Sequence, residues 1–326
     1  MLFFSTQTYD KEYFDRYNKY NYQYTYLDCA LNENTVDLAK DHEVVCIFVN
    51  DKADDRVIIA LAKHGIKLIA LRCAGFNNVD LDAAKAHNIS VVRVPEYSPH
   101  AVAEHAVAML LTLNRKTHKA YTRVREGDFS LNNLLGFDLY QKNVGVIGAG
   151  KIGTAFVKIM LGFGCNVFIH DPIHDQSLVE AGARYVDINS LFAQSDIISL
   201  HCPLNKDTLH MINEASIKQM KPGVFIINTS RGAIIDTRAA KASLQTGQIG
   251  YLALDVYEQE EGIFFQDLSQ TIIHDDLLME LTTYPNVLIT SHQGFFTREA
   301  LIAIATTTAK NINSFLSGKI TNQITI

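Results

Sequence analysis

The sequence predicts an α/β protein with two doubly wound, parallel-sheet domains. Short apolar runs of strand character alternate with helical patterns along most of the chain, and such alternation is typical of parallel sheets that helices cover on both faces. A glycine fingerprint, Gly148-Ala149-Gly150-Lys151-Ile152-Gly153, follows an apolar run in mid-chain. Because a second alternating series starts there, we expect two sheets and not one.

The first series is expected to form one sheet of five strands. The predicted strands are residues 2–5, 22–27, 44–49, 67–71 and 89–94. Helices are predicted between them at residues 9–18, 35–41, 54–64 and 81–87. Pro95 and Pro99 then interrupt the pattern, and residues 101–125 have the composition of one long helix.

The second series is expected to form a sheet of six strands. The predicted strands are residues 144–147, 167–170, 197–201, 224–228, 251–255 and 287–290. A further helix, residues 298–316, lies beyond the last of them. We expect that helix to return to the first sheet, which would make the second domain an insertion in the first.

The fingerprint predicts a dinucleotide site. Gly148 permits a tight turn, Gly150 lets the backbone approach a pyrophosphate, and Gly153 lets helix and strand pack closely. Asp171 ends the next strand, 23 residues after Gly148, near the spacing at which a carboxylate accepts the adenine-ribose hydroxyls. That carboxylate would repel a 2′-phosphate, and Pro172 and the residue after it supply no arginine, so the sequence favours NAD over NADP.

Length, composition and charge argue against several other classes of protein. The 326 residues suffice for two domains with cores of their own, and 48% are hydrophobic. The net charge is −6 with scattered lysines and arginines, which argues against nucleic acid or an anionic membrane as partner. The five cysteines lack zinc-like spacing and are expected to be reduced, with no metal site. Neither a signal peptide nor a membrane-spanning segment is recognisable, so we expect a cytoplasmic protein.

Three segments at strand ends of the second series carry candidate chemistry. Residues 228–232 include Arg231, residues 255–260 are rich in carboxylates, and residues 290–294 include His292. An arginine can bind a carboxylate and polarise a carbonyl, and a histidine can supply a proton near neutral pH. A carboxylate beside the histidine would favour its charged ring. The set suits reduction of a 2-keto acid. Two alternatives stay open: Glu258 could take the role of the carboxylate in place of Glu260, and His201 could be the proton donor in place of His292.

The chain resembles the D-isomer-specific 2-hydroxyacid dehydrogenase family over nearly its whole length, and within it most the branch of fermentative D-lactate dehydrogenases. The segments that carry the resemblance are residues 71–80, 94–99, 148–153, 201–204, 228–232, 255–260 and 291–292. Many family members have proline where this chain has Glu261 and Ser291. The D-lactate branch departs in similar ways.

The resemblance implies roles for individual residues. It implies that Arg231, Glu260 and His292 are catalytic, that backbone amides around Ala74 and Gly75 receive the substrate carboxylate, and that Tyr97, Phe295 and Phe296 bound the side-chain pocket. For NAD it implies contacts along the fingerprint and at the strand ends, from Gly148, Gly150, Lys151, Ile152, Gly153, Asp171, Cys202, Pro203, Thr208, Thr229, Ser230, Arg231 and Asp255. Packing within the loop is the alternative for Cys202 and Thr208.

The resemblance also implies a fold and an activity. We expect a Rossmann NAD-binding domain, residues 99–296, inserted in a flavodoxin-like substrate domain, residues 1–98 and 297–326. The expected reaction is reduction of pyruvate to D-lactate with NADH. The alternatives are another substrate, such as glyoxylate, hydroxypyruvate or a larger 2-keto acid, and an NAD(H)-sensing corepressor of the same fold. A homo-oligomer, a dimer or a dimer of dimers, is expected; the apolar residues 101–113 suit either a dimer contact or burial inside one chain.

Overall fold

A computed structural model describes residues 1–325 and divides the chain into two compact units. The first comprises residues 1–98 and those from 295 onward, and the second comprises Pro99–Gly294. The expected second boundary, between residues 296 and 297, is therefore two residues too late. The reason is aromatic packing, because the ring of Phe295 contacts Phe48 and Tyr97, and the ring of Phe296 contacts Tyr9.

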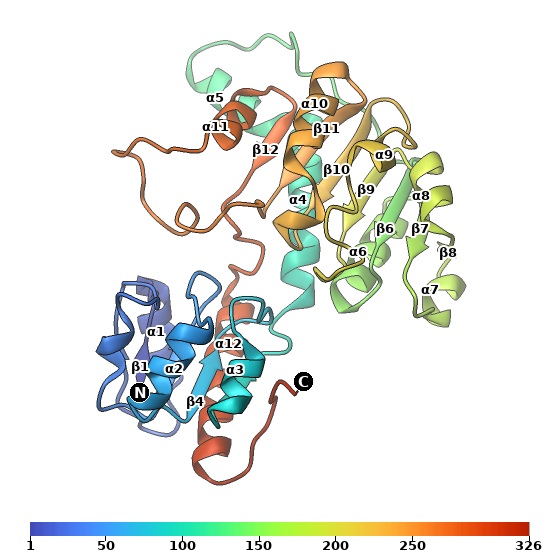
Figure 1. Cartoon of the computed structure of the whole chain (residues 1–326). Helices are drawn as coiled ribbons and strands as arrows, with labels where there is room; N and C mark the ends of the chain where they lie inside the picture. The colour runs from blue at the N-terminus through green and yellow to red at the C-terminus, as the bar shows by residue number, and fades with distance from the viewer. Residues whose placement is uncertain (326) are drawn as a thin grey trace. The chain divides into compact units, whose positions relative to one another are not determined.

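The first unit holds a parallel five-stranded sheet in the order β2-β1-β3-β4-β5. This is the flavodoxin-like order, as expected. Figure 1 labels β1 and β4 of this sheet. Its strands are β1 Leu2–Phe3, β2 Thr25–Tyr26, β3 Val44–Ile47, β4 Leu68–Leu71 and β5 Ser90–Arg93. Its helices are α1 Thr8–Arg16, α2 Asp55–Lys63, α3 Leu81–Ala86 and α12 Arg298–Leu316, with a 3₁₀ turn at Val36–Ala39. All residues of β3 and β4 are buried, which is why these strands are continuous apolar runs.

A buried arginine lies at the carboxyl end of β4. Arg72 is 1% exposed, and its Nη2 donates to the carbonyl oxygens of Phe4 at 2.8 Å and Ser5 at 2.7 Å. Its Nε lies 3.4 Å from Oδ1 of Asp10, and its guanidinium lies 5.1 Å from the ring centre of Phe48. Arg72 thus joins the ends of β1 and β4 immediately before the segment that continues to Ala74 and Gly75.

The second unit holds a parallel seven-stranded sheet in the order β12-β11-β10-β9-β6-β7-β8. Its strands are β6 Asn143–Ile147, β7 Asn166–His170, β8 Arg184–Tyr185, β9 Ile197–Leu200, β10 Val224–Asn228, β11 Ile249–Leu254 and β12 Val287–Ile289. The strand order reverses beside β6, and parallel sheets bind ligands beyond the carboxyl ends of strands at such a reversal. The Rossmann arrangement is therefore confirmed.

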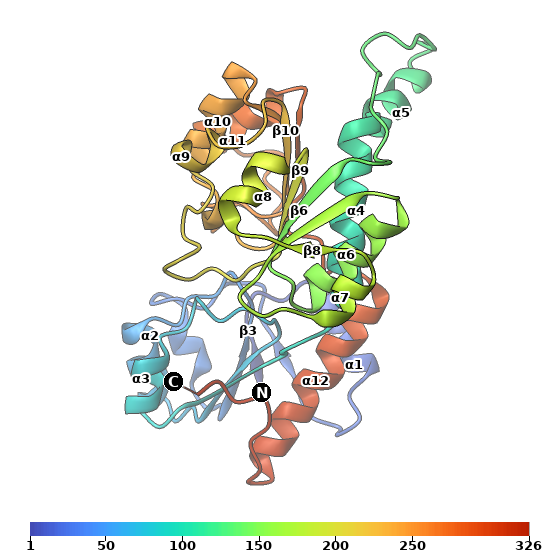
Figure 2. The same ribbon diagram turned by 90° about the vertical axis from the view of Figure 1, so that its right-hand side faces the viewer.

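Two layers of helices cover this sheet, which Figure 2 shows nearly edge-on. One layer contains α4 Pro99–Arg115, α6 Lys151–Gly162 and α7 Gln176–Glu180; the other contains α8 Ile188–Gln194, α9 Glu214–Ile217, α10 Thr237–Thr246 and α11 Asp276–Thr283. Each layer packs a separate apolar core on its face of the sheet. Among the described residues, no helix is long and apolar enough to cross a membrane.

Three expectations for local structure were wrong. The helix expected at residues 101–125 is two helices, α4 and α5 Thr117–Arg125, because Lys116 adopts a left-handed backbone with φ +53° between them. The helix expected at residues 35–41 is only the 3₁₀ turn, and the two-residue strand β8 was not expected. Most apolar side chains of residues 101–113 are buried within the chain, and α4 packs against α6. Burial inside one chain thus explains their apolar character.

Candidate functional site

The glycines of the fingerprint are needed at two positions and leave space at the third. A Cβ on Gly148, whose φ is +92°, would lie 2.6 Å from the backbone nitrogen of Cys202. A Cβ on Gly153 would run into the carbonyl oxygen of Gly148. A Cβ on Gly150, at the N-cap of α6, would meet no atom within 4 Å. The helix N-terminus therefore faces open space, where its N–H groups and dipole can bind a pyrophosphate.

Asp171 is fixed beside this turn at the end of β7. Its Oδ2 accepts from the amide of Ala149 at 2.6 Å, and its Oδ1 accepts from the amide of Ile173 at 2.8 Å. A carboxylate can accept about four hydrogen bonds, so each oxygen keeps capacity for a ribose hydroxyl. The geometry fits the predicted ribose contact.

Side chains that are predicted to contact NAD form hydrogen bonds in the loops after β9 and β10. The hydroxyl of Ser230 donates to the carbonyl oxygen of Cys202, and Thr208 Oγ1 donates to the carbonyl oxygen of Pro203 at 2.6 Å. Thr229 Oγ1 is buried and has no hydrogen-bond partner in the part of the chain that the structure describes. A buried hydroxyl without a partner is uncommon, and it suits a polar group that a bound dinucleotide brings. The residues present thus fit NAD.

Arg231 follows β10 at the start of the 3₁₀ turn Gly232–Ile234. Its Nη1 donates to the carbonyl oxygen of Ser230 at 2.7 Å, which holds the side chain against its own turn. A Cβ on Gly232 would collide with the backbone of Tyr257, so the turn packs directly on the segment after β11. No hydrogen bond among the described residues joins Arg231 to Glu260 or His292.

Glu260 and His292 form a direct pair. Nδ1 of His292 lies 2.9 Å from Oε1 of Glu260, and their side chains are 17% and 22% exposed, respectively. The other oxygen of Glu260 accepts from the amide of Tyr257 at 3.1 Å. Because Glu260 can only accept while ionised, we assign the proton between them to Nδ1. Nε2 then remains to donate a proton when the ring is charged.

Asp255 organises the loop that carries His292. The Asp255 backbone oxygen accepts from the His292 amide at 2.7 Å. Its carboxylate accepts from Thr290 Oγ1 at 2.6 Å and from the amides of Gln293 and Gly294, both at 2.9 Å. His292 itself has φ +54°, a left-handed conformation uncommon for a residue with a side chain. The bonds from Asp255 on both sides hold it there.

A second histidine approaches the same carboxylate from α4. Nε2 of His105 lies 3.2 Å from Oδ1 of Asp255 and 3.1 Å from Oγ1 of Thr290. Burial alone would raise the pKa of Asp255, but the hydrogen bonds from His105 and Thr290 and the nearby charge of His292 outweigh it and lower the pKa to about 2. Asp255 therefore stays ionised at neutral pH. These bonds engage both its oxygens, so its expected contact with NAD stays a prediction.

Apart from Arg231, the predicted substrate-binding residues lie in the first unit. The carbonyl oxygen of Ala74 accepts from Arg93 Nη1 at 2.8 Å, and Gly75 is the next residue. The ring of Phe295 lies 6.4 Å from that of Tyr97 and 6.1 Å from that of Phe296. Phe295 is 7% exposed and Phe296 is 51% exposed. The structure thus brings the three predicted aromatic residues together.

Comparison with known proteins decides the family. The sequence model described as the NAD binding domain of D-isomer specific 2-hydroxyacid dehydrogenase matches residues 107–294. The chain is 50% identical over 317 residues to D-lactate dehydrogenase of Escherichia coli, and this match covers 97% of this chain and 96% of that protein. It is 51% identical over 319 residues to 2-hydroxyacid dehydrogenase homolog 1 of Schizosaccharomyces pombe, with coverage of 97% and 96%.

The chain belongs to the D-isomer-specific 2-hydroxyacid dehydrogenase family.

The chain superposes with a TM-score of 0.92 on a solved structure described as "Identification of the pyruvate reductase of Chlamydomonas reinhardtii". The two chains are 44% identical, and the match covers 98% of this chain and 96% of that one. The chain is thus an NAD-dependent oxidoreductase. The two relatives compared above are named as dehydrogenases. Turnover with pyruvate would separate the chain from an NAD(H)-sensing corepressor of the same fold.

Among the described residues, no hydrogen bond or ion pair joins His201 or Glu258 to His292, the candidate proton donor of the dehydrogenase. Burial lowers the pKa of His201 to about 3, so that its ring is neutral at pH 7 and a poor source of protons. Glu258 instead pairs with Nε2 of His210 at 2.6 Å and accepts from Thr237 Oγ1 at 3.0 Å. Its role is to join the segment after β11 to α10.

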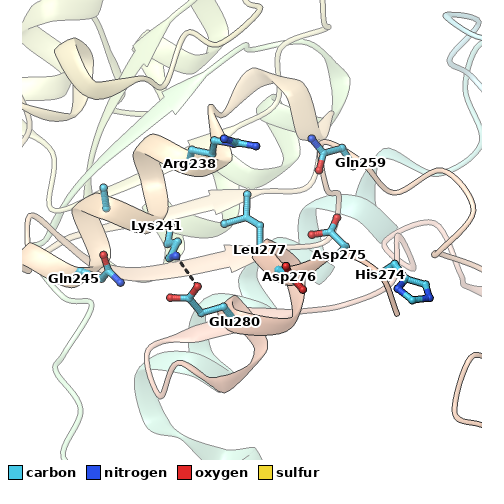
Figure 3. Close-up of a pocket in the computed structure, with 10 residues that line it drawn as sticks. Arg238, Lys241, Gln245, Gln259, His274, Asp275, Asp276, Leu277 and Glu280 are labelled. Carbon is cyan, nitrogen blue, oxygen red and sulfur yellow. Dashed lines mark ion pairs between the residues drawn. The ribbon is translucent and has the colours of Figure 1, made fainter. Parts of the chain in front are cut away.

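A polar cavity of about 610 Å³ lies elsewhere in the dehydrogenase, beside α10 and α11. Figure 3 shows Arg238 and Lys241 on one side and Glu280 on the other, with a dashed line for the ion pair of Lys241 and Glu280. Nζ of Lys241 lies 2.5 Å from Oε2 of Glu280. Gln259 lines it, but Arg231, Glu260 and His292 do not. Within residues 1–325, no group of three His, Cys, Asp or Glu side chains is placed to hold a metal ion.

The lowered pKa of Asp255 predicts a pH-dependent loss of stability in Asp255→Asn. The carboxylate of Asp255 has a pKa of about 2 in the folded protein, below its ordinary value of 3.8. Its negative charge therefore stabilises the fold above about pH 4. We expect the variant to lose about 2 kcal/mol at pH 7 through this charge, and the pH-dependent part of the loss to vanish as the pH falls toward 2. Urea unfolding between pH 2 and pH 7 measures it. Asp82→Asn, at an exposed position, is the control, and an equal pH dependence there would contradict the assignment.

Proposed function

We propose that this dehydrogenase reduces pyruvate to D-lactate with NADH and catalyses the reverse reaction. The pairing of Nδ1 of His292 with Glu260 at 2.9 Å carries the proposal, because it leaves Nε2 to give a proton to a substrate oxygen. The 50% identity to the Escherichia coli D-lactate dehydrogenase supports pyruvate as the keto acid. A cytoplasmic location stays a prediction from the sequence.

In this proposal each catalytic side chain has one task. Arg231 binds the substrate carboxylate through two parallel N–H donors and polarises the adjacent carbonyl. The carbonyl carbon accepts the hydride that bound NADH supplies. Nε2 of His292 gives its proton to the carbonyl oxygen, which completes the alcohol. Glu260 stabilises the charged ring before that transfer, and the proton returns from solvent afterwards.

In the first unit, the amides around Ala74 and Gly75 are proposed to receive the same carboxylate. Tyr97, Phe295 and Phe296 are proposed to bound the space for the substrate side chain. Their bulk favours the methyl group of pyruvate over a longer chain. The alternatives, glyoxylate, hydroxypyruvate and larger 2-keto acids, differ from pyruvate only at this place.

Initial rates on a panel of 2-keto acids test the substrate and the cofactor together. We expect the highest kcat/KM with pyruvate, and a strong preference for NADH over NADPH because Asp171 repels a 2′-phosphate. Asp171→Ala should narrow the cofactor preference without changing the ranking of keto acids. A higher kcat/KM for a larger keto acid would replace pyruvate, and equal use of NADPH by the wild type would refute the role of Asp171.

Replacement of Arg231 by lysine tests the carboxylate anchor. Arg231→Lys keeps the positive charge but loses the fork of donors, so kcat/KM for pyruvate should fall about tenfold or more, equivalent to at least ~1.4 kcal/mol of transition-state stabilisation. Arg238→Lys, on the neighbouring α10, provides a matched control that should retain normal kinetics. Near-normal kinetics for Arg231→Lys would remove Arg231 from the mechanism.

A pH–rate profile tests the proton donor and its partner. Loss of the negative charge in Glu260→Gln destabilises the charged ring of His292, so the alkaline limb of pyruvate reduction should move to lower pH. His292→Ala should lose most turnover yet still bind NADH, since the fingerprint and Asp171 are unchanged. Glu258→Gln is the control and should leave the limb in place. An active His292→Ala would transfer the acid role to another group.

A homo-oligomer is proposed as the working form. The helix α5 buries no residue, and exposed apolar side chains extend from it into the following loop, namely Tyr121 at 65%, Phe129 at 74%, Leu131 at 82% and Leu135 at 86%. Such a group of exposed apolar side chains is typical of a contact surface. Sedimentation should give a mass of two or four chains, and Leu135→Glu should lower it. A monomeric wild type would contradict this proposal.

A further inference from the structure

A phenylalanine contacts the ring of the proposed proton donor. The ring of Phe265 lies 5.7 Å from that of His292 at an angle of 41°. Phe265 belongs to the long loop between β11 and α11 (Figure 1) and no catalytic role described above involves it. Its backbone has φ +64°. Of the eleven described residues other than glycine with positive φ, it alone is apolar.

Such a conformation is strained for a bulky side chain and persists only where the surroundings impose it. Here two contacts impose it. The backbone oxygen of Glu260 accepts from the amides of Ile263 at 3.1 Å and Phe264 at 3.0 Å, which closes a turn directly before Phe265. The side chain of Phe264 is 5% exposed and packs in a small core with Tyr257.

The same residue, Glu260, therefore does two things. Its carboxylate binds Nδ1 of His292, and its carbonyl closes the turn that presents Phe265 to the ring of His292. His292 is itself in a left-handed conformation. The two strained residues thus meet through their side chains.

We propose that Phe265 is a positioning residue, whose ring holds the imidazole of His292 in the orientation that keeps Nδ1 on Glu260 and Nε2 directed to the substrate. This proposal rests on the proposed function of His292 as proton donor. An imidazole that rotates away from Glu260 loses both the hydrogen bond and the alignment needed for proton transfer.

Phe265→Gly separates this role from a structural one. Phe265 is partly buried against the core that contains Tyr257 and Phe264. Glycine loses that packing but adopts φ +64° without strain, so we expect only a small change in melting temperature. We expect kcat for pyruvate reduction to fall about fivefold or more with little change in KM or in NADH binding, because the chemical step alone is affected. Phe265→Tyr retains the ring and should restore most of the activity. Ile272→Gly, an exposed position in the same loop, is the matched control and should behave as the wild type.

The ring proton on Nδ1 of His292 gives a second readout. In protein labelled with ¹⁵N-histidine and saturated with NADH, a proton held by Glu260 exchanges slowly and should give a resolved signal, which His292→Gln assigns by its absence. We expect this signal to be lost or broadened in Phe265→Gly and kept in Ile272→Gly. A structural role for Phe265 would not change it selectively.

The outcomes separate this proposal from the proposed function. If His292→Ala is inactive while Phe265→Gly has the wild-type kcat and an unchanged signal, Phe265 does not position the ring and His292 remains the acid. If His292→Ala is active, the proton-donor role fails whatever the behaviour of Phe265. A fall in both melting temperature and activity in Phe265→Gly, without recovery in Phe265→Tyr, would assign Phe265 to folding and overturn the proposal.

Discussion

The carboxylate of Asp255 is the constraint on which the catalytic end of the second unit depends. An ionised carboxylate that is 1% exposed loses several kcal/mol of hydration unless donors replace the water. Here the donors are Thr290, Gln293, Gly294 and His105. Three of these four donors flank His292 in the chain, so satisfying the buried charge also fixes the left-handed backbone of His292. The pair with Glu260 is a consequence of that backbone geometry.

The first unit also has a buried charged side chain that binds the backbone at its strand ends. Arg72 is buried after β4, and the carbonyl oxygens of Phe4 and Ser5 after β1 accept from it. Backbone that leaves a sheet loses its ladder partners, and a buried charge with several hydrogen-bonding positions can replace them. In each unit a fully buried ion thus holds irregular backbone at the carboxyl edge of the sheet. The segment with Ala74 and Gly75 and the loop with His292 are both continuations of such edges.

Local sequence patterns predicted the sheets, the fingerprint and Asp171, because turn chemistry and strand spacing act over about 25 residues. The location of Arg231, Glu260 and His292 at strand ends followed from the geometry of parallel sheets. Sequence could not show that His105 would reach Asp255, since 150 positions separate them and only packing of α4 on the sheet joins them. The left-handed conformations of Lys116 and Phe265 gave no signal either, because neither residue type favours that conformation.

The insertion of one unit into the other has a consequence for the order of folding during synthesis. The second unit is continuous, from Pro99 to Gly294, so its whole sheet is available before the chain is complete. The first unit lacks α12 until Arg298–Leu316 emerge, and α12 packs against α1 and β4. Its N-terminal part must therefore wait with apolar surface of β4 uncovered while nearly two hundred residues are added. Because a ribosome adds only about 5–20 residues per second, this unfinished sheet persists for roughly 10 s or longer, a period in which a chaperone can bind it.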